Sequence, residues 1–142
     1  MPVRNAEARW EGDLVHGKGS MKVGSGAFHA PFSFATRFEG QPGTNPEELI
    51  AAAHAGCFSM AFSAALGKAG FTPTSVQTSA AVHLEKIGEG FKITRSVLRM
   101  QAKVPKLDQG KFREIAEAAK KGCPVSQALA GVQIELDATL ES

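Results

Sequence analysis

One long helix with complete start signals, at residues 45–67, constrains the fold of this 142-residue chain more than any other feature. Asn45 suits the N-cap, Pro46 suits the first helical position, and the two glutamates that follow suit the first turn. The helical pattern continues to Gly67 or Gly70, and either glycine can adopt the left-handed conformation that closes a helix. The sequence therefore predicts about six turns of helix at the centre of the chain.

Strands are predicted on both sides of this helix. Residues 6–38 are predicted as β-structure with glycine-rich turns, ending in an alternating strand over 32–38 with its phenylalanines on one face. After the helix, the pattern predicts a hairpin, an amphipathic helix, a short helix and a last strand, at residues 76–104, 108–121, 124–129 and 132–140. This order predicts an α+β fold with antiparallel sheets around a long central helix that bears a cysteine. Residues 1–142 are expected to form a single domain.

Composition narrows the classes of function. The net charge is +2 and no run of Lys or Arg forms a basic stripe, so a nucleic-acid partner is not expected. No apolar stretch approaches the ~20 residues of a membrane span, and residues 48–66, which come nearest, are mostly alanine interrupted by polar side chains. The N-terminus lacks the apolar core of a secretory signal. We therefore expect a cytoplasmic protein, in which a cysteine pair is more often catalytic or redox-sensing than a static staple.

The two cysteines stand far apart in the sequence. Cys57 lies in the apolar helical run, and Cys123 lies where one predicted helix stops and the next begins. Because His54 precedes Cys57 by three residues, the two share a helix face, and a Cys–His pair or half of a metal site is conceivable. Neither CxxC nor HExxH spacing is present, which favours a polar neighbour or a core histidine. Both cysteines can also be inert, because buried cysteine packs as a small hydrophobe.

A reactive cysteine must be a thiolate, and the two sites differ in how they favour one. Cys57 is about three turns inside its helix, where apolar surroundings raise the pKa of a thiol, so it needs a cation nearby. Arg37, on the polar side of the predicted aromatic strand, is the candidate. Cys123 is expected at a helix N-terminus, where backbone N–H groups favour a thiolate. Local structure alone thus predicts that Cys123 is the more acidic cysteine.

Two motifs resemble a known family. The segment TNPEELIAAAHAGCFSM at residues 44–60 resembles the signature of the OsmC/Ohr family of osmotically inducible and organic hydroperoxide resistance proteins. The segment KGCPVS at residues 121–126 resembles the second cysteine motif of that family. ARWEGD at 8–13 and TRFEG at 36–40 are similar to the OsmC branch rather than the Ohr branch. The resemblance covers essentially the whole chain.

The resemblance implies a thiol-dependent peroxidase of the stress response. Cys57 would be the peroxidatic cysteine and Cys123 the resolving one, while Arg37 would hold the thiolate and Glu47 would orient Arg37. The resemblance also implies an intertwined homodimer with active sites at the subunit interface. Organic hydroperoxides would be preferred to hydrogen peroxide, a thiol such as a lipoylated protein would be the reductant, and no metal or organic cofactor would be needed.

Spacing adds a constraint on this site. Glu47 and Cys57 are ten residues apart, so on one straight helix they are separated by ~15 Å and face directions about 80° apart. We therefore predict that the helix breaks between them, or that Arg37 and Glu47 come from the other subunit. The alternative function, of a different class, is a non-catalytic redox sensor or a protein that binds a hydrophobic ligand.

Overall fold

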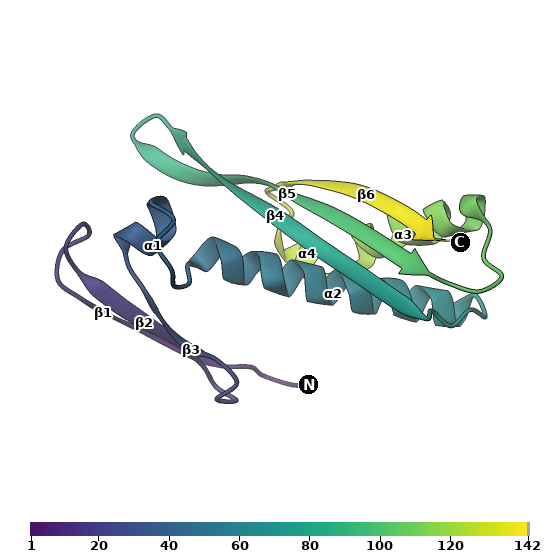
Figure 1. Ribbon diagram of the computed structural model, residues 1–142, viewed down its shortest axis with the longest axis horizontal. Coiled ribbons are helices and arrows are strands. Elements are labelled where there is room, and N and C mark those ends of the chain that lie inside the picture. The colour runs from purple at the N-terminus through teal and green to yellow at the C-terminus, as the bar shows by residue number, and fades with distance from the viewer. Residues whose placement is uncertain (142) are drawn as a thin grey trace. The chain divides into compact units, whose positions relative to one another are not determined.

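The computed structural model describes residues 1–141, and the chain divides into two compact units. The first unit comprises residues 1–49 and the second begins at Ile50. Figure 1 shows their helices and strands along the chain. The expectation that all 142 residues work as a single domain stays a prediction.

The first unit is a three-stranded antiparallel sheet followed by a short helix. Its strands pair in the order β1-β2-β3, so that each strand lies beside its neighbour in sequence. Trp10 on β1 and Phe32 on β3 pack ring against ring, with centroids 5.4 Å apart, on one face of the sheet. The elements are β1 (Ala6–Glu11), β2 (Lys18–Val23), β3 (His29–Phe32) and α1 (Phe34–Phe38).

The predicted strand over 32–38 is wrong beyond Phe32, because Ser33 starts a helix there. Its hydroxyl accepts a hydrogen bond from the Thr36 N–H at 3.2 Å, and the Thr36 hydroxyl accepts one from the Ser33 N–H at 2.8 Å. This reciprocal capping box satisfies backbone groups that a strand would leave for a neighbour. Phe34 and Phe38 then lie four residues apart on one helix face, with ring centroids at 4.8 Å. Arg37 is therefore carried by a helix, not by a strand.

The long helix α2 (Pro46–Lys68) has the ends that the sequence predicts. The Asn45 side chain accepts a hydrogen bond of 2.7 Å from a first-turn N–H, as an N-cap does. At the other end Gly70 has a φ of 90°, and the Phe71 N–H donates to the Leu66 carbonyl at 2.9 Å, the pattern of a Schellman motif. Helix α2 is thus closed by hydrogen bonds at both ends.

Helix α2 is unbroken between Glu47 and Cys57. The prediction that the helix breaks there is wrong. The helix continues through Gly56, and a single glycine is not enough to interrupt it. The other alternative, in which the arginine and glutamate act on the partner subunit's cysteine, stays a prediction.

The second unit contains a three-stranded sheet in the order β4-β5-β6. Strands β4 and β5 form the expected antiparallel hairpin, but β6 runs parallel to β5. Antiparallel pairing is therefore confirmed for the first sheet and the hairpin and is wrong for the last strand. The reason is the connection: two helices carry the chain back across the sheet, and such a crossover returns it in the same direction. The remaining elements are β4 (Ser75–Ile87), β5 (Gly90–Lys103), α3 (Gln109–Gly122), α4 (Pro124–Ala128) and β6 (Gln133–Glu141).

The core of the second unit lies between one face of this sheet and its helices. Helix α2 runs along the sheet in Figure 1 and buries one residue per turn, Phe58, Phe62 and Leu66, against it. Phe62 meets Phe112 of α3 edge to face at a centroid distance of 5.7 Å. Strand β5 supplies the same core with alternate side chains, including Leu98, and the core extends to Cys123. The α+β class with a long cysteine-bearing helix is confirmed.

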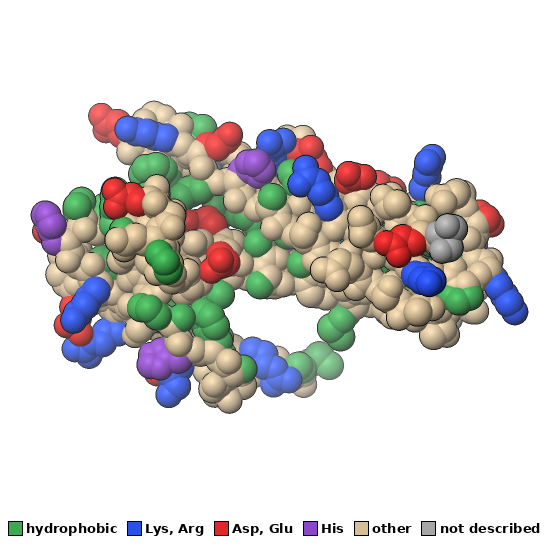
Figure 2. All heavy atoms as spheres, in the orientation of Figure 1, with side chains coloured by type: hydrophobic (Ala, Val, Ile, Leu, Met, Phe, Trp, Pro, Cys, Tyr) green, Lys and Arg blue, Asp and Glu red, His purple; other side chains and the backbone are tan. Residues whose placement is uncertain are grey.

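The opposite side of α2 is apolar and exposed. Met60 is 76 % exposed, and small residues continue the same side of the helix: Ala52, Ala53, Gly56, Ala64 and Gly67. By length and composition alone, α2 is apolar enough to cross a membrane, a property that core helices of soluble proteins share. The expectation that no apolar stretch approaches the length of a membrane span is therefore wrong for α2, because its many alanines count as apolar. On the face shown in Figure 2, Lys and Arg side chains are interspersed with Asp and Glu.

Candidate active site

The structure brings together the two cysteines, which are 66 positions apart in the sequence. Cys57 on α2 and Cys123, between α3 and α4, are both free thiols, and they are close enough that each shifts the pKa of the other. Cys57 is partly exposed and Cys123 is fully buried. One thiol is thus accessible to a reagent from solution, and the second lies beside it, shielded from solution.

The environments of the two thiols shift their pKa values in opposite directions. Burial raises the pKa of Cys57, and the neighbouring Cys123 raises it further. Burial also raises the pKa of Cys123, but hydrogen bonds from Cys57 and from the backbone N–H and hydroxyl of Ser126 outweigh it, so the pKa is lowered. The backbone N–H of Val125 favours both thiolates. Local structure therefore makes Cys123 the more acidic cysteine, as predicted.

His54 does not pair with Cys57. Its ring is completely buried, and each ring nitrogen lies at hydrogen-bond distance from a serine hydroxyl, Nδ1 at 2.7 Å from Ser96 Oγ and Nε2 at 2.8 Å from Ser126 Oγ. Burial lowers the pKa of His54, which keeps the imidazole neutral. Both of its nitrogens are occupied, so the alternative of a His54–Cys57 half-site for a metal has no free ring nitrogen to offer. Within residues 1–141, no three His, Cys, Asp or Glu side chains are grouped as a metal site requires.

The other predicted pair, Arg37 and Glu47, lies in the first unit. Arg37 Nε donates to Glu47 Oε1 at 2.8 Å and Nη2 donates to Oε2 at 3.1 Å, so the guanidinium and carboxylate meet in a two-pronged ion pair. The Glu47 side chain is only 9 % exposed, while that of Arg37 is 35 % exposed. Such a fork fixes the orientation of the guanidinium and leaves donors on its free edge. The expectation that Glu47 orients Arg37 is consistent with this contact.

An aromatic pocket adjoins Arg37 in the same unit. Its volume is about 300 Å³, and the guanidinium carbon lies 5.3 Å from the Phe38 ring centroid. A pocket that combines apolar walls with one oriented cation suits a ligand with an apolar body and a polar, electron-rich group. The pocket is lined by Trp10, Leu14, Phe32, Ser33, Phe34, Arg37 and Phe38.

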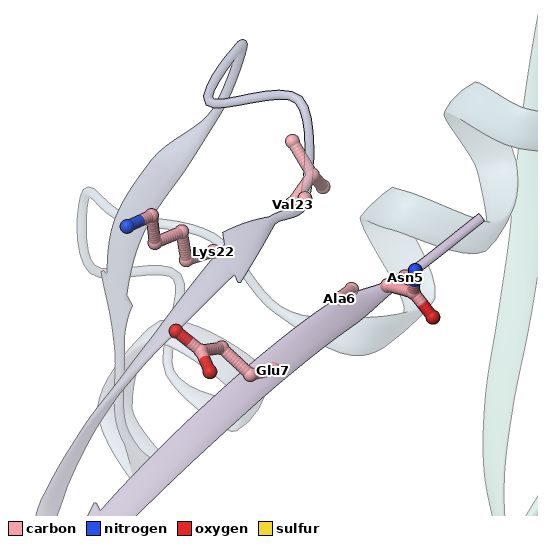
Figure 3. Close-up of a pocket in the computed structure, with 6 residues that line it drawn as sticks. Asn5, Ala6, Glu7, Lys22 and Val23 are labelled. Atoms are coloured by element: carbon pink, nitrogen blue, oxygen red, sulfur yellow. The ribbon is translucent and has the colours of Figure 1, made fainter.

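A second hollow in the first unit has a different character. It has a volume of about 220 Å³ and lies at the ends of β1 and β2, where Figure 3 shows the side chains of Glu7 and Lys22. These two residues are register partners on adjacent strands. The hollow is lined by no thiol, histidine or aromatic ring, so it offers none of the chemistry found at the cysteine pair.

Comparison with known proteins defines the class. The family model described as OsmC-like protein matches residues 38–137, which include both cysteines and Glu47. This chain therefore belongs to the OsmC-like protein family. It is 52 % identical over 140 residues to the peroxiredoxin OsmC of Escherichia coli strain K12, an alignment that covers 98 % of this chain and 97 % of that protein. It is 33 % identical over 102 residues to an organic hydroperoxide resistance protein of Xanthomonas axonopodis pv. citri, with 71 % and 68 % covered.

Solved structures share the fold. The organic hydroperoxide resistance protein OhrB of Bacillus subtilis superposes with a TM-score of 0.70 at 26 % identity, covering 96 % of this chain and 98 % of that one. An OsmC-like protein of Mycoplasma pneumoniae superposes with a TM-score of 0.76 over 99 % of both chains. At 14 % identity, the second likeness concerns the fold alone.

The sequence did not assign a role to the two serines around His54. Ser126 follows Cys123 by three residues within the second motif, and this spacing, one helical turn, is the signal that could have placed its hydroxyl near the sulfur. Ser96 carries no comparable signal, because it is one serine on a strand of alternating residues and meets His54 only through the tertiary fold.

Proposed function

We propose that this protein is a thiol-dependent peroxidase that reduces organic hydroperoxides. The observation that carries the proposal is an accessible thiol, Cys57, held against a buried second thiol, Cys123, with no disulfide between them. The similarity to a peroxiredoxin and to an organic hydroperoxide resistance protein supports a peroxidase-type function.

The proposed cycle uses both sulfur atoms. The Cys57 thiolate attacks the distal oxygen of the hydroperoxide, whose O–O bond breaks to give an alcohol and a Cys57 sulfenic acid. Cys123 then attacks the sulfenic sulfur, the hydroxyl leaves as water, and a Cys57–Cys123 disulfide forms. An external dithiol reduces this disulfide by thiol–disulfide exchange and becomes oxidised in turn. Because the resolving thiol is already adjacent, the disulfide can form before a second peroxide over-oxidises Cys57.

Arg37 supplies the charge that the cysteine pair lacks. The structure raises the pKa of the Cys57 thiol, so a nearby cation is needed to make it a thiolate at neutral pH. We propose that Arg37, oriented by Glu47, holds the thiolate and polarises the peroxide. Because the helix is unbroken between Glu47 and Cys57, we favour the arrangement in which Arg37 and Glu47 act on the partner subunit's cysteine.

The proposed substrates are apolar hydroperoxides. The pocket beside Arg37 is walled by aromatic rings and Leu14, which suit an alkyl or aryl group better than the small polar hydrogen peroxide. The proposed reductant is a dithiol, with a lipoylated protein as the candidate. A cytoplasmic location, in which such dithiols stay reduced, remains a prediction.

The proposed assembly is a homodimer that covers the exposed side of α2. Met60 and the small residues beside it form an apolar helix surface that one chain leaves open to solvent. Small side chains allow another helix to approach closely, and the symmetric copy of the same surface is the simplest partner. This arrangement also explains the membrane-like hydropathy of α2, since the helix would be buried on all sides.

Mass spectrometry of the oxidised protein tests the proposal. One equivalent of cumene hydroperoxide should link the Cys57 and Cys123 peptides with loss of two hydrogens, and dihydrolipoamide should support repeated turnover. The Cys57→Ser variant should consume no peroxide, and the Cys123→Ser variant should react once and then accumulate over-oxidised Cys57. Undiminished turnover by Cys57→Ser would refute the mechanism. A disulfide that forms without turnover would instead favour the alternative, a redox sensor or ligand-binding protein.

A further inference from the structure

His54 sits in a hydrogen-bonded chain that ends at the resolving cysteine. Ser96 Oγ, His54 and Ser126 Oγ are joined by contacts of 2.7 and 2.8 Å. Ser126 follows Cys123 by three residues, and its hydroxyl lowers the pKa of the Cys123 thiol. All four residues are buried, with His54, Ser96 and Cys123 at zero exposure and Ser126 at 6 %. The side chains come from β5, α2, α4 and the residue before α4.

The order of protons along this chain depends on the state of Cys123. A hydroxyl has one proton to donate, so Ser126 can donate to His54 or to the Cys123 sulfur, but not to both. When Cys123 is a thiol, its proton can point to Ser126, whose own proton points to His54 Nε2, and Nδ1–H donates to Ser96. When Cys123 is a thiolate, Ser126 donates to the sulfur and accepts from Nε2–H. Between the two states, the Cys123 proton moves to Ser126 and the Ser126 proton moves to His54 Nε2.

The burial of Cys123 indicates a role for this hydrogen-bonded series of side chains. Cys123 must lose a proton as it attacks, and because it has no exposed surface, bulk water cannot take that proton directly. A neutral imidazole has one unprotonated ring nitrogen, and Nε2 lies 2.8 Å from Ser126 Oγ, where it can accept the proton. Because burial lowers the pKa of His54, the imidazole does not retain that proton and passes it on. Ser96 then accepts a hydrogen bond from the second N–H, so the imidazolium has a partner at each nitrogen.

We propose that Ser126 and His54 form a proton relay for Cys123, with His54 as a positioning residue that acts through Ser126. The inference rests on the proposed peroxidase function and concerns its second step. As the Cys123 sulfur attacks the Cys57 sulfenic acid, its proton passes to Ser126 and the Ser126 proton passes to His54 Nε2. The S–O bond breaks and the S–S bond forms. The proton held by His54 Nε2 then returns to Ser126, and the Ser126 hydroxyl gives up its own proton to the hydroxide that leaves Cys57. The products are one disulfide and one water, with no net change at His54.

Variants separate a relay from a structural role. His54→Gln keeps an amide that can hydrogen-bond to Ser126 but has no nitrogen that can take a proton. Ser126→Ala breaks the link to Cys123 and leaves the imidazole in place. Ser59→Ala is the matched control, because Ser59 lies on the same helix as His54. Its hydroxyl bonds to the Ala55 carbonyl and to Thr78, and it takes no part in the proposed relay.

The experiment follows the reduced protein after one equivalent of cumene hydroperoxide, with acid quenching and mass spectrometry. Loss of the Cys57 thiol should proceed at the wild-type rate in every variant. Disulfide formation should be slowed at least about tenfold in His54→Gln and in Ser126→Ala, and less than about twofold in Ser59→Ala, since positioned proton transfer contributes factors of this size or more. Circular dichroism of each variant shows whether it is folded.

Two results would overturn the relay. If His54→Gln forms the disulfide at the wild-type rate, the amide has replaced the imidazole and no proton is taken by His54. If Ser59→Ala is slowed as much as Ser126→Ala, the effect is a general loosening of the packing around the cysteines. In both cases the peroxidase function would stand. If the wild-type protein itself forms no disulfide, the proposed function fails, and the relay fails with it.

Discussion

At the scale of single residues, the site depends on how a few side chains are charged. The thiol that is open to solution, Cys57, has its pKa raised, and the thiol with the lowered pKa, Cys123, is buried. The cysteine pair alone would therefore place its thiolate on the wrong sulfur for attack on a substrate. In the proposed mechanism, the Arg37–Glu47 fork supplies the oriented positive charge that would reverse this order.

Replacement of Arg37 by Lys should show whether orientation matters as well as charge. Lysine keeps the positive charge but cannot form two parallel hydrogen bonds to Glu47, so peroxide turnover should fall at least about tenfold. Glu47→Gln should cause a loss in the same direction. Arg95→Lys is the control, because Arg95 makes one contact of 3.1 Å to Glu135 on a partly exposed strand surface. Equal loss in Arg37→Lys and Arg95→Lys would contradict the proposed role.

The buried His54 should make stability depend on pH. Its pKa is lowered in the folded chain from the 6.5 of an exposed histidine, so below about pH 6.5 the unfolded chain binds more protons than the folded one. Stability from this group is complete above pH 6.5 and is lost on acidification, by up to about 1.4 kcal/mol per pH unit until the folded pKa is reached. Urea unfolding at pH 7.5 and 5.5 measures this loss. His54→Gln should lack it, and an identical loss in both proteins would contradict the assignment.

At the scale of elements, α1 shows how a short helix can govern a site. It has only five residues, too few to be stable alone, and it carries Arg37. The capping box between Ser33 and Thr36 starts the helix, and the packing of Phe34 on Phe38 holds its face together. The direction of the guanidinium therefore depends on a hydrogen bond four residues earlier in the chain.

Loss of the Ser33 hydroxyl should weaken both the helix and the site. Ser33→Ala removes a cap that is typically worth about 1 kcal/mol and frees the residues that orient Arg37, so stability and peroxide turnover should both fall. Urea unfolding and peroxide consumption measure the two effects. Ser33→Thr keeps the hydroxyl and serves as the control. Full activity in Ser33→Ala would show that Arg37 is held by Glu47 alone.

At the scale of the whole molecule, the two sides of α2 differ in burial. One side buries Phe58, Phe62 and Leu66 in the core of the second unit, and the other side exposes Met60 among small residues. A soluble monomer rarely leaves such a continuous apolar surface open. Two copies joined through this surface would bury it and bring each chain's Cys57 near residues of the other.

The assembly can be tested on the exposed side of α2. Sedimentation should give a species of twice the 14.9 kDa chain mass. Met60→Lys should raise the dissociation constant of that dimer by about tenfold or more, because an unpaired ammonium would be buried at the contact. Ala118→Lys, at an exposed position of α3, adds the same charge elsewhere and should leave the dimer intact. A monomeric wild-type protein would refute the proposed dimer, and recovery only with detergent would point to a membrane.

Much of the fold could be predicted because its signals are local. The caps of α2, the hairpin of β4 and β5, and the break at Cys123 all depend on residues within a few positions of one another. The resemblance also pointed to Cys57, Cys123, Arg37 and Glu47 as candidate site residues, and their roles stay a prediction. Two local predictions failed where a competing local interaction prevailed: the Ser33 cap replaced a strand with α1, and the unbroken α2 excluded a helix break.

What the sequence by itself determined, then, is where helices and strands begin and end, since backbone hydrogen bonds to near neighbours decide this. Only the tertiary structure decided that β6 runs parallel to β5 and that His54 meets Ser96 and Ser126, which are 42 and 72 residues away. No local pattern encodes such contacts, because they form only when the core packs and buried polar groups must find partners. The pairing of two thiols with opposite pKa shifts arises from the same packing.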